Sequence, residues 1–171
     1  DAARGVTVLF GGYTASSPYW NAETWEWNGS AWTQRVVSGP SARRGHAMAY
    51  DAARGVTVLF GGYVDSTNPY NDETWEWNGT AWTRRTVSGP SARYGHAMAY
   101  HAARAVTVLF GGYTSAARNG ETWGLAVACA ADLDGDGFVT GDDFTLFVTW
   151  FETGDIRADF DHDGFLTGDD F

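Results

Sequence analysis

Apolar and polar residues follow a pattern along this chain that repeats every 50 residues. The segment 1–13 returns unchanged at 51–63 and nearly unchanged at 101–113. Repetition at a fixed period indicates one structural unit copied in tandem, so the chain should be read as an array. The pattern stops at about Cys129, and an acidic sequence of a different kind follows it.

The complete unit, residues 40–89, carries the pattern of four short strands. The run of residues 56–60 is almost entirely apolar, which is typical of a strand covered on both faces. The double glycine Gly61-Gly62 ends this run. Residues 73–77 alternate between polar and aromatic side chains, which is the pattern of a strand with one buried face. Asn78-Gly79 then predicts a type I′ hairpin turn. We expect strands at 45–50, 56–60, 73–77 and 80–87.

The flanking units are incomplete. The unit 1–39 lacks the opening strand, and the unit 90–128 ends at Thr122-Trp-Gly-Leu125 without the Asn-Gly turn and the last strand. We therefore expect ten strands in about three units, which is too few to close a ring. The first part of the chain, residues 1–128, should form an open array with exposed faces at both ends.

Charge divides the chain at the same place. Residues 1–128 hold nine acidic residues against ten arginines, whereas residues 129–171 hold twelve acidic residues against Arg157 alone. The formal charge of -10 thus belongs to the tail, and an acidic block of this density either stays disordered or binds cations. No basic surface exists to neutralise phosphates, which argues against nucleic acid as a partner. No apolar run is long enough for a membrane span.

The repeated unit resembles the kelch repeat and the central β-propeller of galactose-oxidase-like proteins. The resemblance is carried by Arg-x-Gly-His at 43–46 and 93–96, by the Gly-Gly-Tyr triplets, and by a tryptophan in each of the last two strands. It implies a propeller of about six or seven blades. We expect the chain to be mainly β: an open fragment of a kelch-type β-propeller, about three blades, with a small C-terminal module of calcium loops and a helix.

The repeats contain no residues arranged for catalysis. His46 and His96 recur in register, which favours a structural hydrogen bond over a metal or acid–base role. The carboxylates of Glu23/Glu26 and Glu73/Glu76 stand at i and i+3 on a strand and therefore point to opposite faces, where solvent or arginine is the expected partner. The repeats also lack the cysteine that galactose-oxidase chemistry requires.

Aromatic residues of the variable loops are candidates for ligand contact. Tyr19, Trp20 and Tyr70 could stack on a carbohydrate or on a protein partner, although aromatic residues in loops are also ordinary. The sequence leaves both interpretations open.

The tail contains the same twelve-residue pattern twice, at 132–143 and 159–170. Aspartate stands at positions 1, 3, 5 and 12, with glycine at position 6, as in loops that wrap Ca²⁺ with oxygen ligands. Position 7 contributes only a backbone carbonyl, and the threonine at position 9 coordinates directly or through water. The candidate calcium ligands are Asp132, Asp134, Asp136, Phe138, Thr140, Asp143, Asp159, Asp161, Asp163, Phe165, Thr167 and Asp170.

A solvated acidic linker is the alternative to two calcium sites. It does not account for the glycine at position 6 or the apolar residue at position 8, each of which occurs twice. Because aspartate at position 12 is shorter than the usual glutamate, we expect weak affinity. After the first loop, residues 142–152 predict a helix, with an apolar stripe of Phe144, Phe147, Val148 and Phe151. The second loop, at the end of the chain, should be the weaker site.

A calcium loop followed by one helix, used twice, resembles a type I dockerin over residues 130–171. The resemblance implies attachment to a cohesin-like or surface protein partner. The chain departs from the family at loop positions 10 and 11, where Gly141-Asp142 and Gly168-Asp169 replace the usual recognition residues.

Together these features predict a secreted or cell-surface, calcium-binding interaction protein without enzymatic activity of its own. The alternative is a fragment of a dockerin-bearing carbohydrate-active enzyme whose catalytic residues lie outside this chain. A third hypothesis treats the tail as a structural clip on the last repeat, and Cys129 as a boundary residue.

Overall fold

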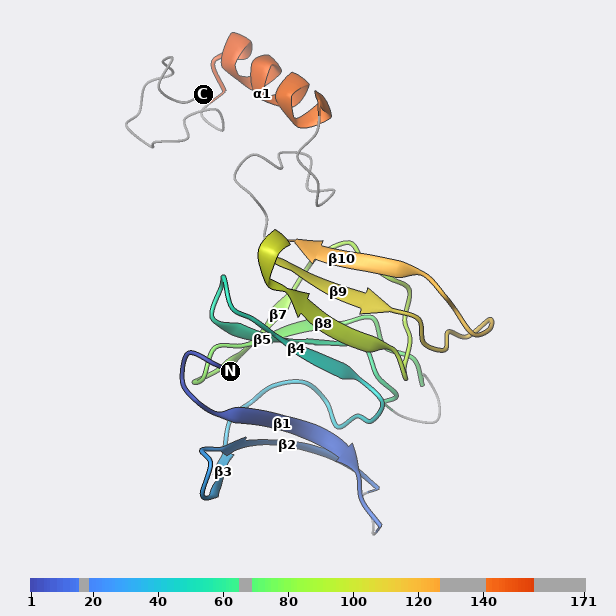
Figure 1. Ribbon diagram of the computed structural model, residues 1–171. Coiled ribbons are helices and arrows are strands. Elements are labelled where there is room, and N and C mark those ends of the chain that lie inside the picture. The colour runs from blue at the N-terminus through green and yellow to red at the C-terminus, as the bar shows by residue number, and fades with distance from the viewer. Residues whose placement is uncertain (16–18, 65–68, 127–140, 156–171) are drawn as a thin grey trace. The chain divides into compact units, whose positions relative to one another are not determined.

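The computed structural model describes residues 1–15, 19–64, 69–126 and 141–155. The chain divides into two compact units, Asp1–Leu125 and Ala126–Phe171. The described residues are mainly β, with three antiparallel sheets in the first unit and one α-helix in the second (Figure 1). The expected β-rich class is therefore confirmed.

The complete repeat forms a four-stranded antiparallel sheet in which sequence neighbours pair, in the order β4-β5-β6-β7. All four strands lie where the hydrophobic pattern predicts them: β5 matches its expected range, β6 and β7 are shorter than theirs, and β4 is shifted toward the C-terminus and ends one residue later. Pairing is continuous, with Ala47 opposite Phe60 and Thr57 opposite Trp77. The bounds are β4 Ala47–Asp51, β5 Val56–Phe60, β6 Thr74–Trp77 and β7 Trp82–Arg85.

The turn between β6 and β7 differs from the expected type I′ turn. Trp77 pairs with Trp82, so four residues form the loop, and Asn78 does not take the positive φ that a type I′ turn requires. Instead the Asn78 side-chain oxygen accepts hydrogen bonds from the backbone N–H groups of Thr80 and Ala81, at 2.9 Å each. Asparagine thus shapes this turn through its side chain rather than through a left-handed backbone.

The flanking repeats form three-stranded sheets, as the sequence predicts. The first sheet, in the order β1-β2-β3, lacks the opening strand, and the third, β10-β9-β8, lacks the last one. The described residues thus hold ten strands, the expected number. The bounds are β1 Thr7–Tyr13, β2 Trp20–Trp27, β3 Trp32–Arg35, β8 Ala97–His101, β9 Val106–Phe110 and β10 Thr122–Ala126, with a short 3-10 turn at Ala102–Arg104.

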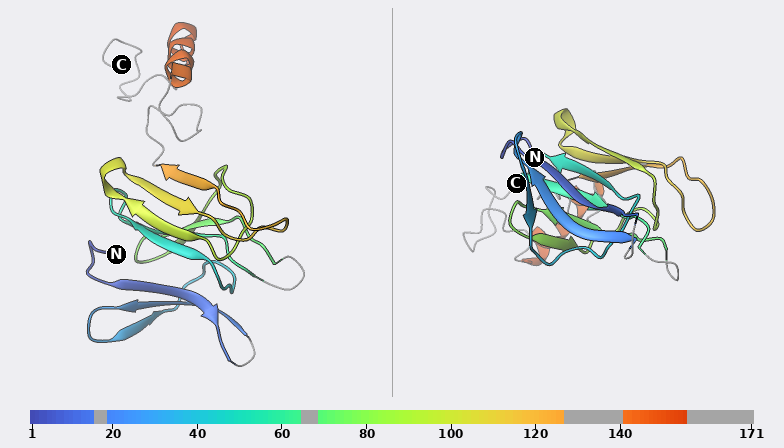
Figure 2. Two further views of the ribbon diagram at one scale, coloured as in Figure 1. Left: turned by 45° about the vertical axis from the view of Figure 1, so that its right-hand side comes forward. Right: turned by 90° about the horizontal axis from the view of Figure 1, so that it is seen from below.

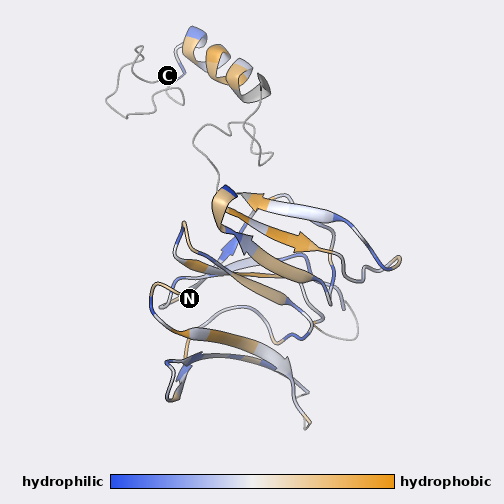
Figure 3. Cartoon of the chain, viewed as in Figure 1, coloured by the Kyte–Doolittle hydropathy of each residue, from blue (hydrophilic) through white to orange (hydrophobic). Residues whose placement is uncertain are grey.

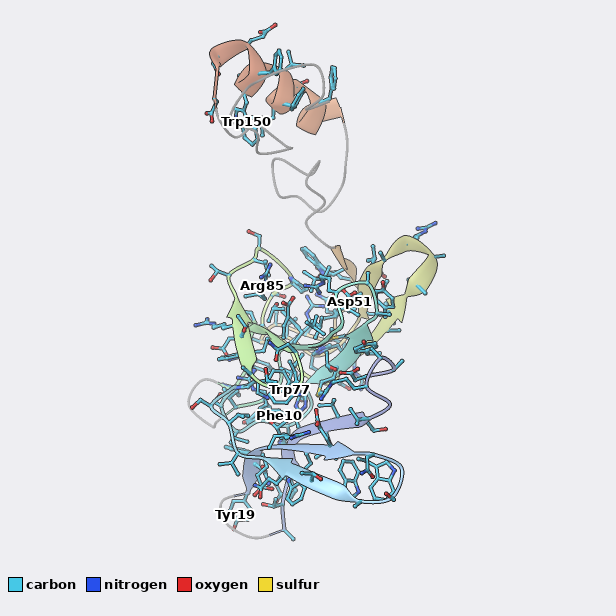
Figure 4. The ribbon with its side chains drawn as sticks, turned by 90° about the vertical axis from the view of Figure 1, so that its left-hand side faces the viewer. Phe10, Tyr19, Asp51, Trp77, Arg85 and Trp150 are labelled. Carbon is cyan, nitrogen blue, oxygen red and sulfur yellow. The ribbon has the colours of Figure 1, made fainter. Side chains whose placement is uncertain are left out.

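Aromatic side chains join the first sheet to the central one. The ring of Phe10 meets the ring of Trp82 edge to face, with 5.3 Å between centroids. Trp82 Nε1 donates a hydrogen bond to the Thr24 hydroxyl at 2.8 Å, and Trp77 Nε1 donates one to Glu26 Oε1 at 2.9 Å. Phe10 and Trp77 both lie where the two sheets meet (Figure 4). These contacts form the core of the first unit.

Burial of the apolar strand depends on the neighbouring sheet. In β5 of the central sheet, Phe60 exposes only 4% of its surface, whereas its counterpart Phe110 in the third sheet exposes 57%. Strand β9 is nevertheless strongly hydrophobic (Figure 3). The expectation of a strand covered on both faces is therefore confirmed for the central repeat, and the outer repeats keep an uncovered apolar face.

The double glycine is required by close approach between repeats. Gly61 has a φ of +65°, and a Cβ atom there would lie 2.6 Å from the carbonyl oxygen of Arg93. Gly62 N–H donates a hydrogen bond to that same carbonyl at 2.9 Å. A side chain at Gly61 would separate the end of β5 from the start of the next repeat, so glycine fixes their spacing.

The second unit contains helix α1 at Gly141–Thr153, which confirms the predicted helix. Phe147 is buried, and its ring contacts that of Phe151 with 5.9 Å between centroids. Phe144 and Phe151 are exposed, so only part of the predicted apolar stripe is covered. None of the helices that the structure describes has the length and apolar character needed to cross a membrane.

Candidate functional site

Both predicted calcium loops lie outside the described residues, apart from the backbone of the last three residues of the first loop, 141–143. The twelve ligand positions therefore stay predictions. Helix α1 begins at Gly141, which is position 10 of the first loop. Asp143, at position 12, consequently lies in the first turn of a helix, where the twelve-residue loop places its last ligand.

The chemistry of the predicted ligands suits calcium. Each loop offers four aspartates, a threonine hydroxyl and a backbone carbonyl, all oxygen donors, and no thiol or imidazole at a ligand position. Hard divalent cations prefer such a set. Within the described part of the chain, no group of three or more histidine, cysteine or acidic residues is arranged to hold a metal ion.

The two repeated histidines are packed between sheets. His46 lies edge-on to Phe10 and His96 edge-on to Phe60, with centroid distances of 5.7 and 5.6 Å. Burial, assisted by the positive charge of Arg43 for the first and Arg93 for the second, lowers the pKa of each histidine to about 4. Both rings are therefore neutral at physiological pH, and they act as packing elements of the core.

This burial predicts that acid destabilises the first unit. An unfolded histidine titrates near 6.5, so between pH 6.5 and 4 the unfolded chain binds protons that the folded chain does not. The free energy of unfolding should fall across this window, by up to about 3 kcal/mol for each histidine. Urea unfolding as a function of pH measures it. His96→Gln should make the free energy of unfolding depend less on pH, whereas His101→Gln, at an exposed position, should not. Identical pH profiles for the native chain and both variants would contradict the prediction.

The carboxylates of the strands are paired with arginine rather than with each other. Glu26 is buried and accepts ion pairs from Arg4 at 2.6 Å and Arg35 at 2.7 Å. Glu73 pairs with the fully buried Arg43 at 2.7 Å, and Glu76 contacts Arg54. The expected arginine pairing is confirmed for these residues. The burial of Glu26 exceeds the expectation because a tryptophan of the next sheet, Trp77, covers it.

A second candidate lies at one edge of the three sheets and consists of four tyrosines and two arginines. The tyrosines at 13, 63 and 113 each follow a Gly-Gly pair, and residues 44 and 94 precede the first strand of the next sheet. We name this set the tyrosine row. Its members are Tyr13, Arg44, Tyr63, Tyr94, Tyr113 and Arg118.

Contacts connect the tyrosine row from the first sheet to the third. The Arg44 guanidinium lies 5.8 Å from the ring centroid of Tyr13 and 4.9 Å from that of Tyr63. Tyr94 meets Tyr63 edge to face at 5.8 Å and stacks on Tyr113 at 5.4 Å. Arg118 lies 5.4 Å from the Tyr113 centroid.

Loop aromatics named from the sequence border this row. Tyr19 stacks on Tyr13 at 6.1 Å, and Trp20 and Tyr70 each contact the ring of Tyr63. Tyr19 lies in the connection from β1 to β2 (Figure 4). Sequence reasoning found these three but missed the row itself. Its signal in the sequence is the tyrosine that follows every double glycine.

Comparisons with known proteins assign no family to this arrangement. Neither a scan of protein-family models nor a search of curated proteins finds a match to this chain.

Proposed function

We propose that this chain is a calcium-binding interaction protein that acts outside the cell or at its surface. Its first unit would be part of a kelch-like β-propeller that serves as a binding scaffold. Its second unit would be a dockerin-like module that tethers the scaffold to a cohesin-like or surface protein. The place where α1 begins supports this proposal, because a calcium loop at 132–143 would lead into a helix that holds its last ligand in the first turn.

The sheet architecture supports the scaffold part of the proposal. A propeller blade is a four-stranded antiparallel sheet whose sequence neighbours pair, and β4-β5-β6-β7 has that order. The contacts of Trp82 and Trp77 with the preceding sheet are of the kind that stacks one repeat on another. The uncovered apolar faces of the outer sheets are suited to take further repeats.

The tether part of the proposal depends on the carboxylates of the loops. In the absence of cations, Asp132, Asp134 and Asp136 repel one another and disfavour a closed loop. Bound calcium would neutralise this charge and couple metal binding to folding. The exposed Phe144 and Phe151 of α1 then offer an apolar surface to a protein partner. Extracellular calcium near the millimolar range suits loops of weak affinity, which favours the secreted or surface location.

Substitution in each loop tests the proposal. Asp134→Asn and Asp161→Asn should each weaken one site by about tenfold or more, because each removes a charged ligand from a compact oxygen set. The double variant should lose the gain in helicity that calcium induces in the native chain, as measured by far-ultraviolet circular dichroism. The control Asp72→Asn, an exposed aspartate of the first unit, should behave as the native chain does. A calcium response that survives the double substitution would contradict the proposal.

A further inference from the structure

We propose that the tyrosine row binds a carboxylated polysaccharide, a chain of pyranose units that carry carboxylate groups. This inference deepens the scaffold role proposed above and rests on it. It concerns the first unit alone and requires neither calcium nor the second unit.

All members of the tyrosine row lie at one edge of the first unit. Strands β1 and β9 end there and β2 and β10 begin there, and Figures 1 and 2 show these ends on the same side. The row therefore crosses three sheets in succession and offers an extended surface rather than a closed pocket. An extended surface suits a polymer better than a small molecule.

The backbone holds this surface in place before any ligand arrives. Arg44 and Tyr63 exchange both of their backbone hydrogen bonds, at 3.1 and 2.7 Å. Tyr94 and Tyr113 do the same at 3.1 and 2.8 Å. Because the backbone at these positions is already ordered, binding costs little conformational entropy there.

The two outer rings of the row are exposed, and the two inner rings, Tyr63 and Tyr94, are half-buried. Tyr13 exposes 65% of its surface, and Tyr113 is also exposed. The face of a tyrosine ring carries partial negative charge, which attracts the weakly positive C–H groups of a pyranose, and the hydroxyl at the ring tip hydrogen-bonds. Tyrosine and arginine are also enriched at protein–protein interfaces, so an acidic protein is the competing partner that the test below must distinguish. The exposed ring faces are suited to the pyranose faces of a sugar chain.

The positive charge of the tyrosine row favours an anionic polysaccharide over a neutral one. Seven arginines of the first unit form ion pairs with carboxylates: Arg4, Arg35, Arg43, Arg54, Arg84, Arg85 and Arg93. Three exposed arginines, Arg44, Arg104 and Arg118, have no ion pair among the described residues, and two of them, Arg44 and Arg118, belong to the tyrosine row. Their N–H donors match a carboxylate in a bidentate arrangement. Two unpaired guanidiniums among tyrosines thus point to carboxylates carried on a sugar chain.

Binding of three hexameric probes to the whole chain tests the proposal. The probes are hexagalacturonate, neutral cellohexaose and hexaglutamate, titrated by calorimetry in the presence of a calcium chelator. The chelator removes calcium bridging, so a failure here is separate from a failure of the calcium proposal. We expect hexagalacturonate to bind about tenfold more tightly than either other probe, because only it offers both carboxylates and pyranose faces.

Variants locate the binding surface. Arg44→Gln should weaken hexagalacturonate binding about tenfold through loss of a charge-assisted contact. Tyr13→Ala should weaken it by a similar factor through loss of a stacking platform. The controls Arg104→Gln and Trp32→Ala change exposed residues outside the row and should leave the affinity unchanged. Circular dichroism checks that each variant is folded, and Arg118→Gln replaces any variant that is not.

Four results would overturn the proposal. These are absence of hexagalacturonate binding, equal binding of cellohexaose, tighter binding of hexaglutamate, and equal loss in the control variants. Tighter binding of hexaglutamate would indicate an acidic protein as the partner.

Discussion

Trp82→Ala is expected to lower the free energy of unfolding of the first unit by about 4 kcal/mol. Trp82 exposes only 7% of its surface and fills the space between two sheets. Its removal leaves a cavity against Phe10 and deprives the Thr24 hydroxyl of its donor. Urea unfolding followed by far-ultraviolet circular dichroism measures the loss.

The repeat supplies a matched control for this substitution. Trp32 occupies the same position in the first repeat but exposes 46% of its surface, because no other sheet packs against it among the described residues. Its ring contacts only Trp27 among the described aromatic pairs. Trp32→Ala should therefore cost about 1 kcal/mol or less. Equal losses for the two variants would show that the sheets do not stack through Trp82.

Arg43→Met should destabilise the first unit by about 3–5 kcal/mol. The Arg43 side chain is fully buried and donates hydrogen bonds to the carbonyl oxygen of Gly61 at 3.0 Å and to Glu73 Oε2 at 2.7 Å. Burial raises the pKa of Glu73, but hydrogen bonds from Arg43 and Trp75 outweigh this effect and hold the pKa below its ordinary value. Methionine would leave both acceptors without this partner.

The adjacent Arg44 provides the comparison for Arg43. Arg44 has the same side chain one residue further along, yet it is exposed and forms no ion pair within the described residues. Arg44→Met should therefore change the free energy of unfolding by less than about 1 kcal/mol. Thermal and urea unfolding of the two variants and the native chain measure both changes in the free energy of unfolding. A cost for Arg43→Met as small as that for Arg44→Met would contradict the described role of the buried guanidinium.

The strands could be predicted because their signal is local. The apolar run 56–60 and the alternating run 73–77 each identify a strand without knowledge of its neighbours, and the spacing of aromatic residues after 142 identifies α1. The turn at Asn78 could not be predicted in the same way. Its form depends on how Trp77 pairs with Trp82, and the dipeptide Asn-Gly suits more than one hairpin loop.

Burial between repeats depends on residues far apart in sequence. Glu26 becomes buried only because Trp77 of the next sheet donates a hydrogen bond to it. The tyrosine row likewise arises where neighbouring repeats meet, as Tyr63 of one repeat meets Tyr94 of the next. The repeated Gly-Gly-Tyr triplet marks some of these positions but not the contacts between them, so sequence reasoning found the bordering Tyr19 but missed the row. The calcium ligands remain a prediction from spacing alone.

Calorimetric titration of calcium into the whole chain is the most direct test of the central claim. Two aspartate loops predict two binding sites, with dissociation constants of about 10⁻⁴ to 10⁻³ M, as in extracellular modules. Helicity should rise over the same range of concentration, because metal binding and folding are coupled. Absence of binding heat together with unchanged helicity at millimolar calcium would contradict the account.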